Sequence, residues 1–553
     1  ISKDSGYLPT NFTIILYLES FMIDLIIRNG KIIDGTGNSS FLSDVVVNDG
    51  RIVEIEKSSN LESKEEWDAL GKVVCPGFID IHSHADFSLL ADRRNESAIR
   101  QGITTVVTGN CGHGPAPAGT HKLVKQNTVG FSEDWGVDFV WDSFSEYLDC
   151  LFSQGLSVNV APLVPHGTVR LAVLGHSKRK PTIVELEKMK SLVEESMSAG
   201  AIGISTGLEY SPGIYADEQE LSVLASVSAK YNGIYASHIR NRGEKFKLAV
   251  KEALKICSSA GLPAQLSHLA PRPYAPKGSL NQILDLVEQT RVKEGMKIGL
   301  DSFPDIWGPG TVAHLLPYWV YEGDHEEVLN RLKSPETIDT CRKQFSNPSN
   351  FLLRLGGLDK FYLASSKSFP ELIGKNFIEI GDYFSCDPVE GIFKLLLADG
   401  TDYYNVLLRH IYATKTDLDR LLLNSHCSLG SDGVVSAKDG VLSDFTMNRS
   451  SYGYTIRFIK EYVLERKLFQ LEEAIRKMTS LPAESAGLSS RGSIEKNKAA
   501  DILVLNLKDL SDNSSDESPN QYPSGVELVV VNGKIVLEKE KLFSSFPGKH
   551  AKK

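Results

Sequence analysis

GFIDIHSHAD, residues 77–86, is a short apolar segment that ends in two histidines separated by a single residue. Its length and composition predict a β-strand over residues 78–84. Alternate residues of a strand point to the same face, so His82 and His84 can both be directed at one metal ion. An isolated His-x-His pair is weak evidence for a metal site, and its weight depends on where the other potential ligands of the chain lie.

Seven further segments share this pattern of a short apolar run, and longer helical patterns separate them. They are TTVVTGNC (104–111), SVNVAPLVPH (157–166), GAIGISTGL (200–208), GIYASHI (233–239), PAQLSHL (263–269), KIGLDSF (297–303) and CSLGSD (427–432). Strands that alternate with helices predict an α/β fold with a parallel sheet. Eight such units in succession predict a (β/α)8 TIM barrel, which we expect to occupy residues 76–489.

Potential metal ligands lie at the C-terminal ends of these predicted strands. They are His82, His84, Cys111, His238, His268 and Asp432. The C-terminal ends of the strands form one face of a TIM barrel, and active sites are built on that face. Imidazole and thiolate groups are typical zinc ligands, and an aspartate beside a divalent cation stays ionised and can act as a general base. The pattern therefore predicts a zinc site in which Asp432 is suited to act as a general base.

Cys111 is the single cysteine of this set, and the other histidines of the chain lie outside it. A lone cysteine is more often a small buried hydrophobe than a ligand. The Gly-Asn-Cys-Gly setting of Cys111 favours a ligand, because glycines let the backbone approach an ion closely. His113, in the glycine-rich loop, and His166, at the end of the third strand, are candidates for lining the pocket. We expect the other histidines to be structural or solvated, namely His121, His176, His314, His325, His410, His426 and His550.

Both ends of the chain carry hairpin signals. RNGKIID near the N-terminus and VNGKIVL near the C-terminus each contain Asn-Gly, which favours the type I′ turn of a β-hairpin. Their similarity predicts that residues 22–75 and 490–549 pair in one small β-sandwich domain. Residues 1–21 are expected to be an extension outside this domain.

The interval between the seventh and eighth predicted strands is too long for a single crossover connection. We expect it to contain an inserted subdomain over residues 305–385, in which DHEEVLNRLKSPETIDTCRKQF forms helices. A subdomain at the C-terminal face of the barrel could act as a lid that excludes water from the site.

Composition excludes several classes of partner. The net charge of −10 gives no general attraction to phosphate backbones or anionic lipid, so we expect neither a nucleic acid nor a membrane partner. No run of eighteen apolar residues is present, and no signal-peptide pattern accompanies the apolar residues 13–26. Seven scattered cysteines without a Cys-x-x-Cys pair favour a reducing, cytoplasmic location. The expected partner is a small-molecule substrate, and the sequence gives no indication of oligomeric state.

Several motifs resemble the D-aminoacylase (N-acyl-D-amino-acid deacylase) family of the amidohydrolase superfamily. They are VVCPGFIDIHSHAD, GITTVVTGNCG, STGLEYSPG, SHIRNRG, LPAQLSHL, LLPYWVYEG, LGSDG, KMTSLPAESAGLSSRG and SFPGK. The likeness extends from about Met22 to Lys549. Most relatives in the superfamily bridge two metals with a carboxylated lysine on the fourth strand. GAIGISTGL has no lysine, which matches a deacylase that uses Cys111 instead.

The resemblance implies zinc-dependent hydrolysis of N-acyl-D-amino acids to a carboxylate and a free D-amino acid, with a metal-activated water as nucleophile and Asp432 as the catalytic acid/base. It implies two metal positions: a tighter zinc held by Cys111, His238 and His268, and a second, weaker position surrounded by His82, His84 and Asp432. Arg449 in MNRSSYG is the candidate for binding the substrate carboxylate. Tyr210 and Arg240 are further candidates for contacts with the substrate.

Two positions depart from the family pattern. Residues 301–305 read DSFPD where the family usually shows Tyr-Pro-Tyr, and Glu209 stands where relatives often carry another residue type. Other functions on the same barrel stay open, namely a cyclic amidase of the hydantoinase or dihydroorotase kind and a deaminase. The missing fourth-strand lysine disfavours the first, and the GNCG segment disfavours the second. A non-catalytic scaffold should have lost ligands, and all six are present.

Overall fold

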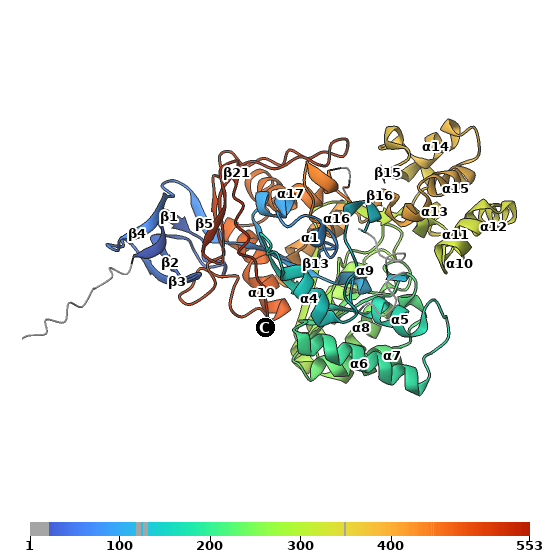
Figure 1. Ribbon diagram of the computed structural model, residues 1–553, viewed down its shortest axis with the longest axis horizontal. Coiled ribbons are helices and arrows are strands. Elements are labelled where there is room, and N and C mark those ends of the chain that lie inside the picture. The colour runs from blue at the N-terminus through green and yellow to red at the C-terminus, as the bar shows by residue number, and fades with distance from the viewer. Residues whose placement is uncertain (1–21, 118–122, 125–130, 348–349, 444, 446) are drawn as a thin grey trace, which may run out of the picture.

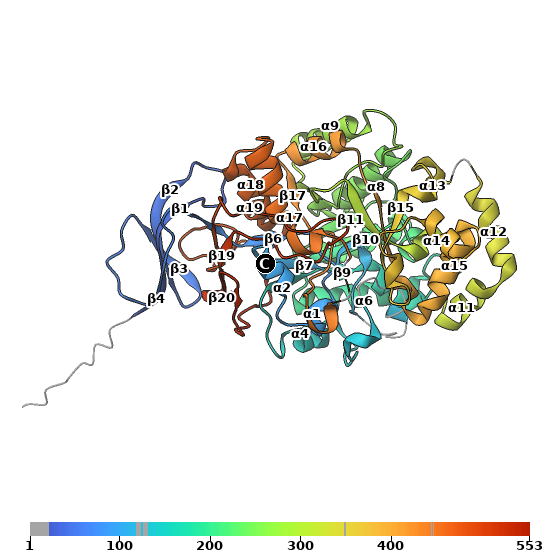
Figure 2. The same cartoon turned by 90° about the horizontal axis from the view of Figure 1, so that it is seen from above.

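The computed structural model describes residues 22–117, 123–124, 131–347, 350–443, 445 and 447–553. The expected extension, residues 1–21, and His121 lie outside the described residues. Three parts follow one another along the length of the molecule: a β-sheet at one end, a central set of strands surrounded by helices, and a mostly helical unit at the other end (Figures 1 and 2). No helix within the described ranges is both long and apolar enough to cross a lipid bilayer.

Each of the eight apolar runs of the central part forms a strand. The strands are β6 (Phe78–Asp80), β7 (Ile103–Thr108), β8 (Asn159–Pro162) with β9 (Val164–Pro165), β10 (Gly203–Gly207), β11 (Ile234–His238), β12 (Ala264–Leu266), β13 (Ile298–Ser302) and β17 (Cys427–Leu429). Nearly all of their residues are buried, because helices cover the sheet on the outside. This burial explains why they appear in the sequence as continuous apolar runs.

The central strands pair in parallel and follow their order in the chain. One sheet has the order β6-β7-β8, and a second has the order β17-β13-β12-β11-β10-β9. Only Leu163 separates β8 from β9, so the two sheets share one crossing segment. A parallel bridge between Ser83 and Gly433 joins the end of β6 to the segment that follows β17. This circular order of eight parallel segments is the order that a TIM barrel requires.

Helices lie between the central strands along the chain, and three more follow the last strand, β17. They include α4 (Phe144–Phe152), α5 (His166–Leu174), α6 (Ile183–Ala199), α7 (Glu218–Ala229), α8 (Phe246–Ala260), α9 (Ser279–Glu294), α16 (Lys415–Leu423), α17 (Ser450–Arg457), α18 (Leu471–Met478) and α19 (Ser480–Ala486), with the short α1 (Ser88–Ala91) and α2 (Glu96–Arg100). Local sequence sets their ends. Helix α6 begins after Thr182, whose side chain forms a capping box with Glu185, and it ends at Gly200, where φ is +113°.

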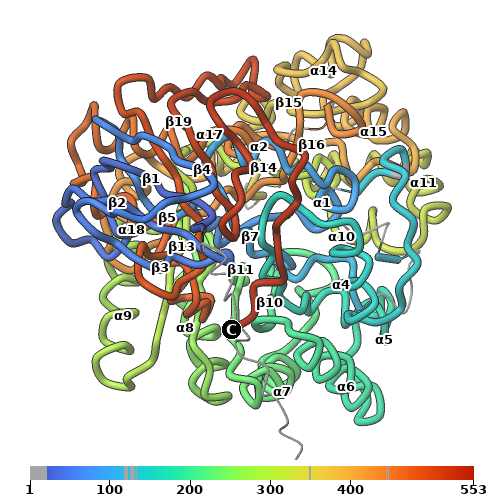
Figure 3. Tube along the Cα trace, turned by 60° about the vertical axis from the view of Figure 1, so that its left-hand side comes forward, coloured from blue at the N-terminus to red at the C-terminus, as the bar shows by residue number. Residues whose placement is uncertain are grey.

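The two ends of the chain lie in one nine-stranded sheet (Figure 3). Its strands are β1 (Ile23–Ile32), β2 (Phe41–Asn48), β3 (Arg51–Glu56), β4 (Ser63–Asp68), β5 (Val73–Pro76), β18 (Ile502–Leu505), β19 (Val526–Val531), β20 (Lys534–Glu538) and β21 (Lys541–Leu542). Strand β5 pairs antiparallel with β18, which joins the N-terminal strands to the C-terminal ones. Both ends of the chain therefore contribute strands to one continuous sheet.

The insertion between β13 and β17 has its own sheet and its own core. Its elements are β14 (Trp307–Thr311), α10 (Tyr318–Tyr321), α11 (His325–Lys333), α12 (Pro335–Phe345), α13 (Phe351–Arg354), β15 (Phe361–Ser365), α14 (Phe377–Tyr383), α15 (Pro388–Ala398) and β16 (Leu407–Ile411). Strand β16 pairs between β14 and β15, so the insertion extends to Ile411 and not only to the expected residue 385. Helices α11 and α12 occupy the segment for which helices were predicted.

Candidate metal centre

Cys111 lies at the middle of three imidazoles. Its Sγ atom is 3.3 Å from Nε2 of His82, 3.5 Å from Nε2 of His268 and 3.8 Å from Nδ1 of His238. The four side chains come from the C-terminal ends of β6, β7, β11 and β12, or from the residues that directly follow them. All four are buried. The parallel strands thus bring together groups that are distant in the chain. His82 and His268, for example, are 186 positions apart and both point into this one space.

Asp432, after β17, forms a second group with the two histidines of the first strand. Its Oδ1 atom is 3.3 Å from Nε2 of His84 and 3.5 Å from Nε2 of His82. Two sets of ligand atoms lie within 4.8 Å of one another: His82 with Cys111 and His268, and His82 with His84 and Asp432. All six predicted ligands therefore meet at one place. His82 belongs to both sets, and His238 contacts Cys111 from the other side.

The backbone at three of these ligands adopts the left-handed region that non-glycine residues rarely occupy. The φ angle is +53° at Cys111, +34° at His268 and +46° at Asp432. Such conformations persist where the surroundings impose them, and they concentrate at functional sites. The packing is also tight here: a Cβ atom on Gly207 would lie 2.1 Å from the carbonyl oxygen of Cys111. Only glycine fits beside the Cys111 turn at that position.

Two carboxylates hold the imidazoles from the outside. Asp301, on β13, places Oδ1 3.2 Å from Nδ1 of His82 and accepts a hydrogen bond of 2.7 Å from the backbone N–H of His268. Glu209 places Oε2 2.9 Å from Nε2 of His238. Such partners orient a metal-binding imidazole and fix which nitrogen faces the ion. Sequence reasoning noted both residues only as departures from a pattern, although Asp301 lies near the C-terminal end of a strand, as the predicted ligands do.

The charges of the site favour the ligand forms of its acidic groups. Burial acts to raise the pKa of the Cys111 thiol, but the nearby imidazoles, His82 above all, lower it well below its ordinary value. Burial likewise acts to raise the pKa of Asp432, and the neighbouring His268 and His84 lower it on balance. Thiolate, imidazole and carboxylate groups gathered in this way are a donor set that suits zinc. The residues present therefore fit a zinc ion.

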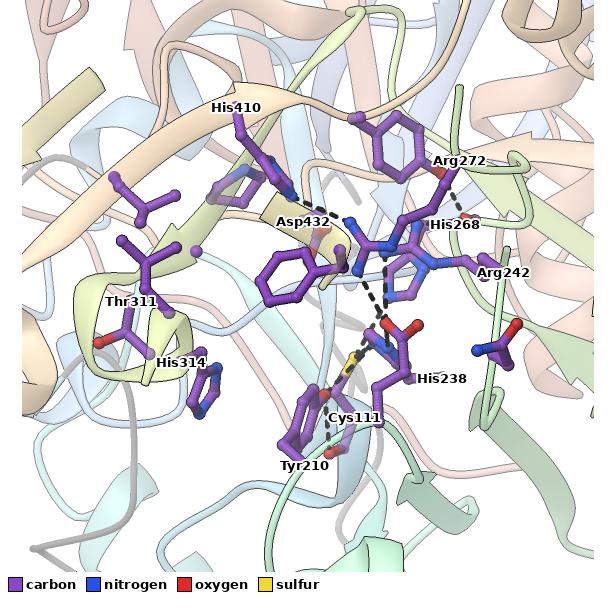
Figure 4. A pocket seen from close by; sticks show the side chains of 18 of the residues that line it. Cys111, Tyr210, His238, Arg242, His268, Arg272, Thr311, His314, His410 and Asp432 are labelled. Atoms are coloured by element: carbon purple, nitrogen blue, oxygen red, sulfur yellow. Dashed lines mark hydrogen bonds and ion pairs between the residues drawn. The ribbon is translucent and has the colours of Figure 1, made fainter. Parts of the chain in front are cut away.

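A cavity of about 400 Å³ opens beside these groups. The insertion supplies one wall of it, largely apolar, with Pro309, Leu315, Phe351, Phe361 and Leu408. Figure 4 shows Thr311 and His314 of the insertion on one side of the cavity, with Arg242, Arg272 and His268 on the other. The candidate metal ligands and the insertion therefore line the same space, which has both a polar end and an apolar surface.

Three histidines other than the candidate ligands line the cavity, and only one of them was proposed to do so from the sequence. His113 lines it, as proposed from the sequence, whereas His314 and His410 also line it and had been expected to be structural or solvated. The ring of His314 stacks on that of Tyr210, with 5.4 Å between the ring centroids, and this contact places His314 at the cavity. Tyr210 belongs to a distant segment, so local sequence does not reveal the contact. His166 is buried elsewhere and places Nε2 2.8 Å from Glu220.

The three residues proposed to contact the substrate take different positions. Tyr210 lines the cavity, and its hydroxyl donates to the Cys111 carbonyl oxygen at 3.3 Å. Arg240 lines it as well, but its guanidinium is bound to Glu252 and to two backbone carbonyls. Arg449 is not among the lining residues, and its Nε lies 2.6 Å from Oδ2 of Asp305. The basic groups that do face the cavity beside the metal ligands are Arg242 and Arg272.

Comparison with known proteins gives consistent matches. The model of the "Amidohydrolase family" matches residues 65–267 and 412–537, and the interval between these two ranges contains the insertion. The chain is 30% identical to an N-acyl-D-glutamate deacylase of Alcaligenes xylosoxydans xylosoxydans, over 92% of this chain and 93% of that protein. It is also 30% identical to a D-aminoacylase of the same organism, over 96% and 97%.

Solved structures show the same likeness. One is an N-acyl-D-glutamate deacylase from Bordetella bronchiseptica, complexed with zinc and a phosphonate inhibitor that mimics the tetrahedral intermediate of the reaction. It has a TM-score of 0.78 and 28% sequence identity, and the alignment covers 96% of this chain and all of the other. The likeness therefore includes the strands that carry the candidate ligands.

Proposed function

The chain belongs to the amidohydrolase family, within its N-acyl-D-amino-acid deacylases, and from this membership we propose that it removes the acyl group from N-acyl-D-amino acids. The protein is a metal-dependent hydrolase of an amide C–N bond. Its products are a carboxylic acid and a free D-amino acid. Its partner is accordingly a small-molecule substrate.

One observation carries the proposal: the Cys111 thiol lies within 3.8 Å of three imidazole nitrogens. Strand β10, the fourth segment of the circular order, contains no lysine that could bridge two metals. We assign Cys111, His238 and His268 to a tighter zinc position, and His82, His84 and Asp432 to a second, weaker one. The zinc named in the Bordetella bronchiseptica deacylase structure supports this choice of metal.

The reaction follows from what each residue can do. Bound zinc supplies a Lewis acid that polarises an amide carbonyl and lowers the pKa of a water molecule. Asp432 keeps its carboxylate ionised, takes the proton of the attacking water and later delivers it to the leaving nitrogen. Burial lowers the pKa of His314 to about 3 and that of His113 to about 4, so both imidazoles are neutral and can hydrogen-bond a substrate oxygen. The insertion lines one wall of the cavity, where it would limit the access of bulk water.

Two finer features of the fold belong to the same proposal. We infer that the eight parallel segments close into a TIM barrel, with the metal ligands at the C-terminal ends of its strands. We also infer that the insertion acts as a lid. The parallel bridge from Ser83 to Gly433 supports closure of the barrel, and the insertion residues that line the cavity support the lid.

A substrate screen on zinc-loaded protein tests the function. We expect hydrolysis of N-acetyl-D-amino acids and, by comparison, little activity on N-acetyl-L-amino acids, hydantoins or amino-substituted heterocycles. Release of ammonia from a heterocycle would indicate a deaminase, and ring opening of a hydantoin a cyclic amidase. A protein that binds zinc and hydrolyses none of these amides would contradict the proposal.

A further inference from the structure

Arg242 is a buried cation with unused hydrogen-bond donors beside the metal centre. The residue follows β11, four positions after His238, and is 4% exposed. Its Nη1 donates to the carbonyl oxygen of His268 at 3.2 Å. Its Nη2 is 3.8 Å from Oε2 of Glu209, beyond hydrogen-bond distance. Its Nε has no hydrogen-bond partner in the part of the chain that the structure describes.

The unused donors of Arg242 lie on one edge of the guanidinium. Nε and Nη2 form a planar fork whose two N–H bonds match the two oxygens of a carboxylate. A buried charged donor without a partner is costly, so a fork left open at the wall of a cavity indicates a ligand that completes it. The ring of Tyr412 lies 4.9 Å from Cζ and holds the guanidinium plane from one face. The guanidinium is therefore held in place while its Nε has no partner among the described residues.

The other two arginines that line the cavity bind protein groups through both of their terminal nitrogens. Arg240 binds Glu252 through Nε and Nη2 and two backbone carbonyls through Nη1 and Nη2. Arg272 places Nη2 2.9 Å from Oε2 of Glu209 and Nη1 3.0 Å from Nε2 of His410. Among the described arginines that line the cavity, Arg242 is thus the one whose Nε and Nη2 both lack a hydrogen bond to the protein.

Glu209 sets the charge of this part of the cavity. It is the carboxylate that faces both Arg272 and Arg242, so it balances one of the two guanidinium charges and leaves one for a ligand. A ligand with one carboxylate completes this balance. A second carboxylate would meet Glu209 or the apolar wall, where Phe351 and Phe361 line the cavity, and either contact disfavours a charged group.

We propose that Arg242 binds the carboxylate of the substrate and that Glu209 restricts the cavity to substrates with one carboxylate, namely N-acyl-D-amino acids with an apolar side chain. This inference rests on the proposed deacylase function. It names a preference that differs from the acidic amino acids in the names of two relatives, N-acyl-D-glutamate and N-acyl-D-aspartate deacylase.

Substrates with and without a carboxylate test the role of Arg242. On N-acetyl-D-leucine we expect Arg242→Gln to lower kcat/KM roughly 30-fold or more, mainly through KM, because a buried charge pair is lost. On N-acetyl-D-leucinamide, which lacks the carboxylate, the same variant should change kcat/KM little. Lys245→Gln is the matched control, since it removes a positive charge from the same loop at an exposed residue. Calorimetric binding of N-acetyl-D-leucine to zinc-loaded Asp432→Asn protein, with and without Arg242→Gln, should show the same loss without turnover.

The outcomes separate this inference from the proposed function. If Arg242→Gln loses the same factor in kcat/KM on N-acetyl-D-leucine and on N-acetyl-D-leucinamide, and its calorimetric affinity is unchanged, the role of Arg242 is overturned. Hydrolysis by the wild type would in that case still support the deacylase function. Failure of the wild type on every N-acyl-D-amino acid would overturn both.

Glu209→Gln tests the charge selection. We expect the ratio of kcat/KM for N-acetyl-D-glutamate to that for N-acetyl-D-leucine to rise about tenfold in this variant, a change of about 1.4 kcal/mol in relative transition-state binding. Zinc per chain is measured alongside, because Glu209 also contacts His238. A wild-type enzyme that prefers N-acetyl-D-glutamate, or a ratio that the substitution leaves unchanged, would overturn the selection.

Discussion

The carboxylate of Asp301 joins two of the candidate metal ligands: Oδ1 lies 3.2 Å from Nδ1 of His82 and accepts the backbone N–H of His268. Its second oxygen accepts a hydrogen bond of 2.7 Å from Nε2 of Gln265. Asp301 is 1% exposed, so these bonds are made away from water. One buried side chain therefore fixes the ring of His82 and the backbone turn of His268 together.

Asp301→Asn is expected to weaken the metal centre without removing a ligand. The amide keeps the shape of the carboxylate but loses the charge that holds the His82 imidazole with Nε2 toward the ion. Loss of such an outer partner typically costs about 10–100-fold in metal affinity or activity. Zinc affinity measured by competition with a chelator, together with kcat/KM, checks this. An Asn variant with wild-type values for both would show that the contact only packs the strand.

Cys111→Ala and His238→Ala test the assignment of the tighter metal position. Each removes one donor from the group around Sγ, so we expect zinc per chain to fall in both variants after dialysis. The control is Cys427→Ala, which removes a buried thiol from β17 outside the group of ligands. If Cys111→Ala and His238→Ala both retain full zinc, the assignment is wrong.

The meeting of the six candidate ligands could be predicted from the sequence because parallel strands impose it. Once the apolar runs are taken as strands, their C-terminal ends must meet on one face, and residues as distant as His82 and Asp432 come together without any knowledge of packing. The same logic applies to Asp301, which lies one residue before the end of β13. The role of Asp301 was not predicted, because residues 301–305 were compared with the residues usual in the family and their position near the end of a strand was not used.

The rest of the cavity depends on contacts that no local pattern encodes. Arg449 has the right charge for a carboxylate, but Asp305, 144 residues earlier in the chain, already binds its guanidinium. His314 and His410 reach the cavity from the insertion, whose sheet is completed only by β16 near its far end. Which arginine stays unpaired is decided by three-dimensional neighbours such as Glu209 and Glu252, and sequence spacing does not contain that information.

Asp432→Asn is expected to separate catalysis from metal binding. His84 and His82 lie 3.3 and 3.5 Å from its Oδ1, and an amide oxygen can keep contacts of this kind but cannot accept a proton. Loss of a general acid/base typically costs about 10²–10⁴ in rate. We expect zinc content near that of the wild type and a kcat reduced by this factor, measured on the same preparation. Near-normal turnover would exclude Asp432 from the proton transfer.

Glu220 provides a test of stability away from the cavity. It lies on α7, is 2% exposed, and contacts both Nε2 of His166 and the fully buried guanidinium of Arg170. Burial acts to raise its pKa, but these two partners lower it below the ordinary value of 4.5. A carboxylate with a lowered pKa stabilises the folded state fully above its unfolded pKa and loses that contribution as the pH falls through the folded pKa.

Glu220→Gln should therefore destabilise the protein by about 3–5 kcal/mol at neutral pH, because it leaves the Arg170 charge buried without a counterion. Glu218→Gln on the same helix is the matched control: it breaks an exposed pair with Lys255 and should cost at most about 1 kcal/mol. Thermal unfolding midpoints of the three proteins at several pH values check this. The gap between wild type and Glu220→Gln should be constant above pH 4.5 and narrow below it. A Glu220→Gln protein as stable as the Glu218→Gln control would show that the buried pair contributes no net stability.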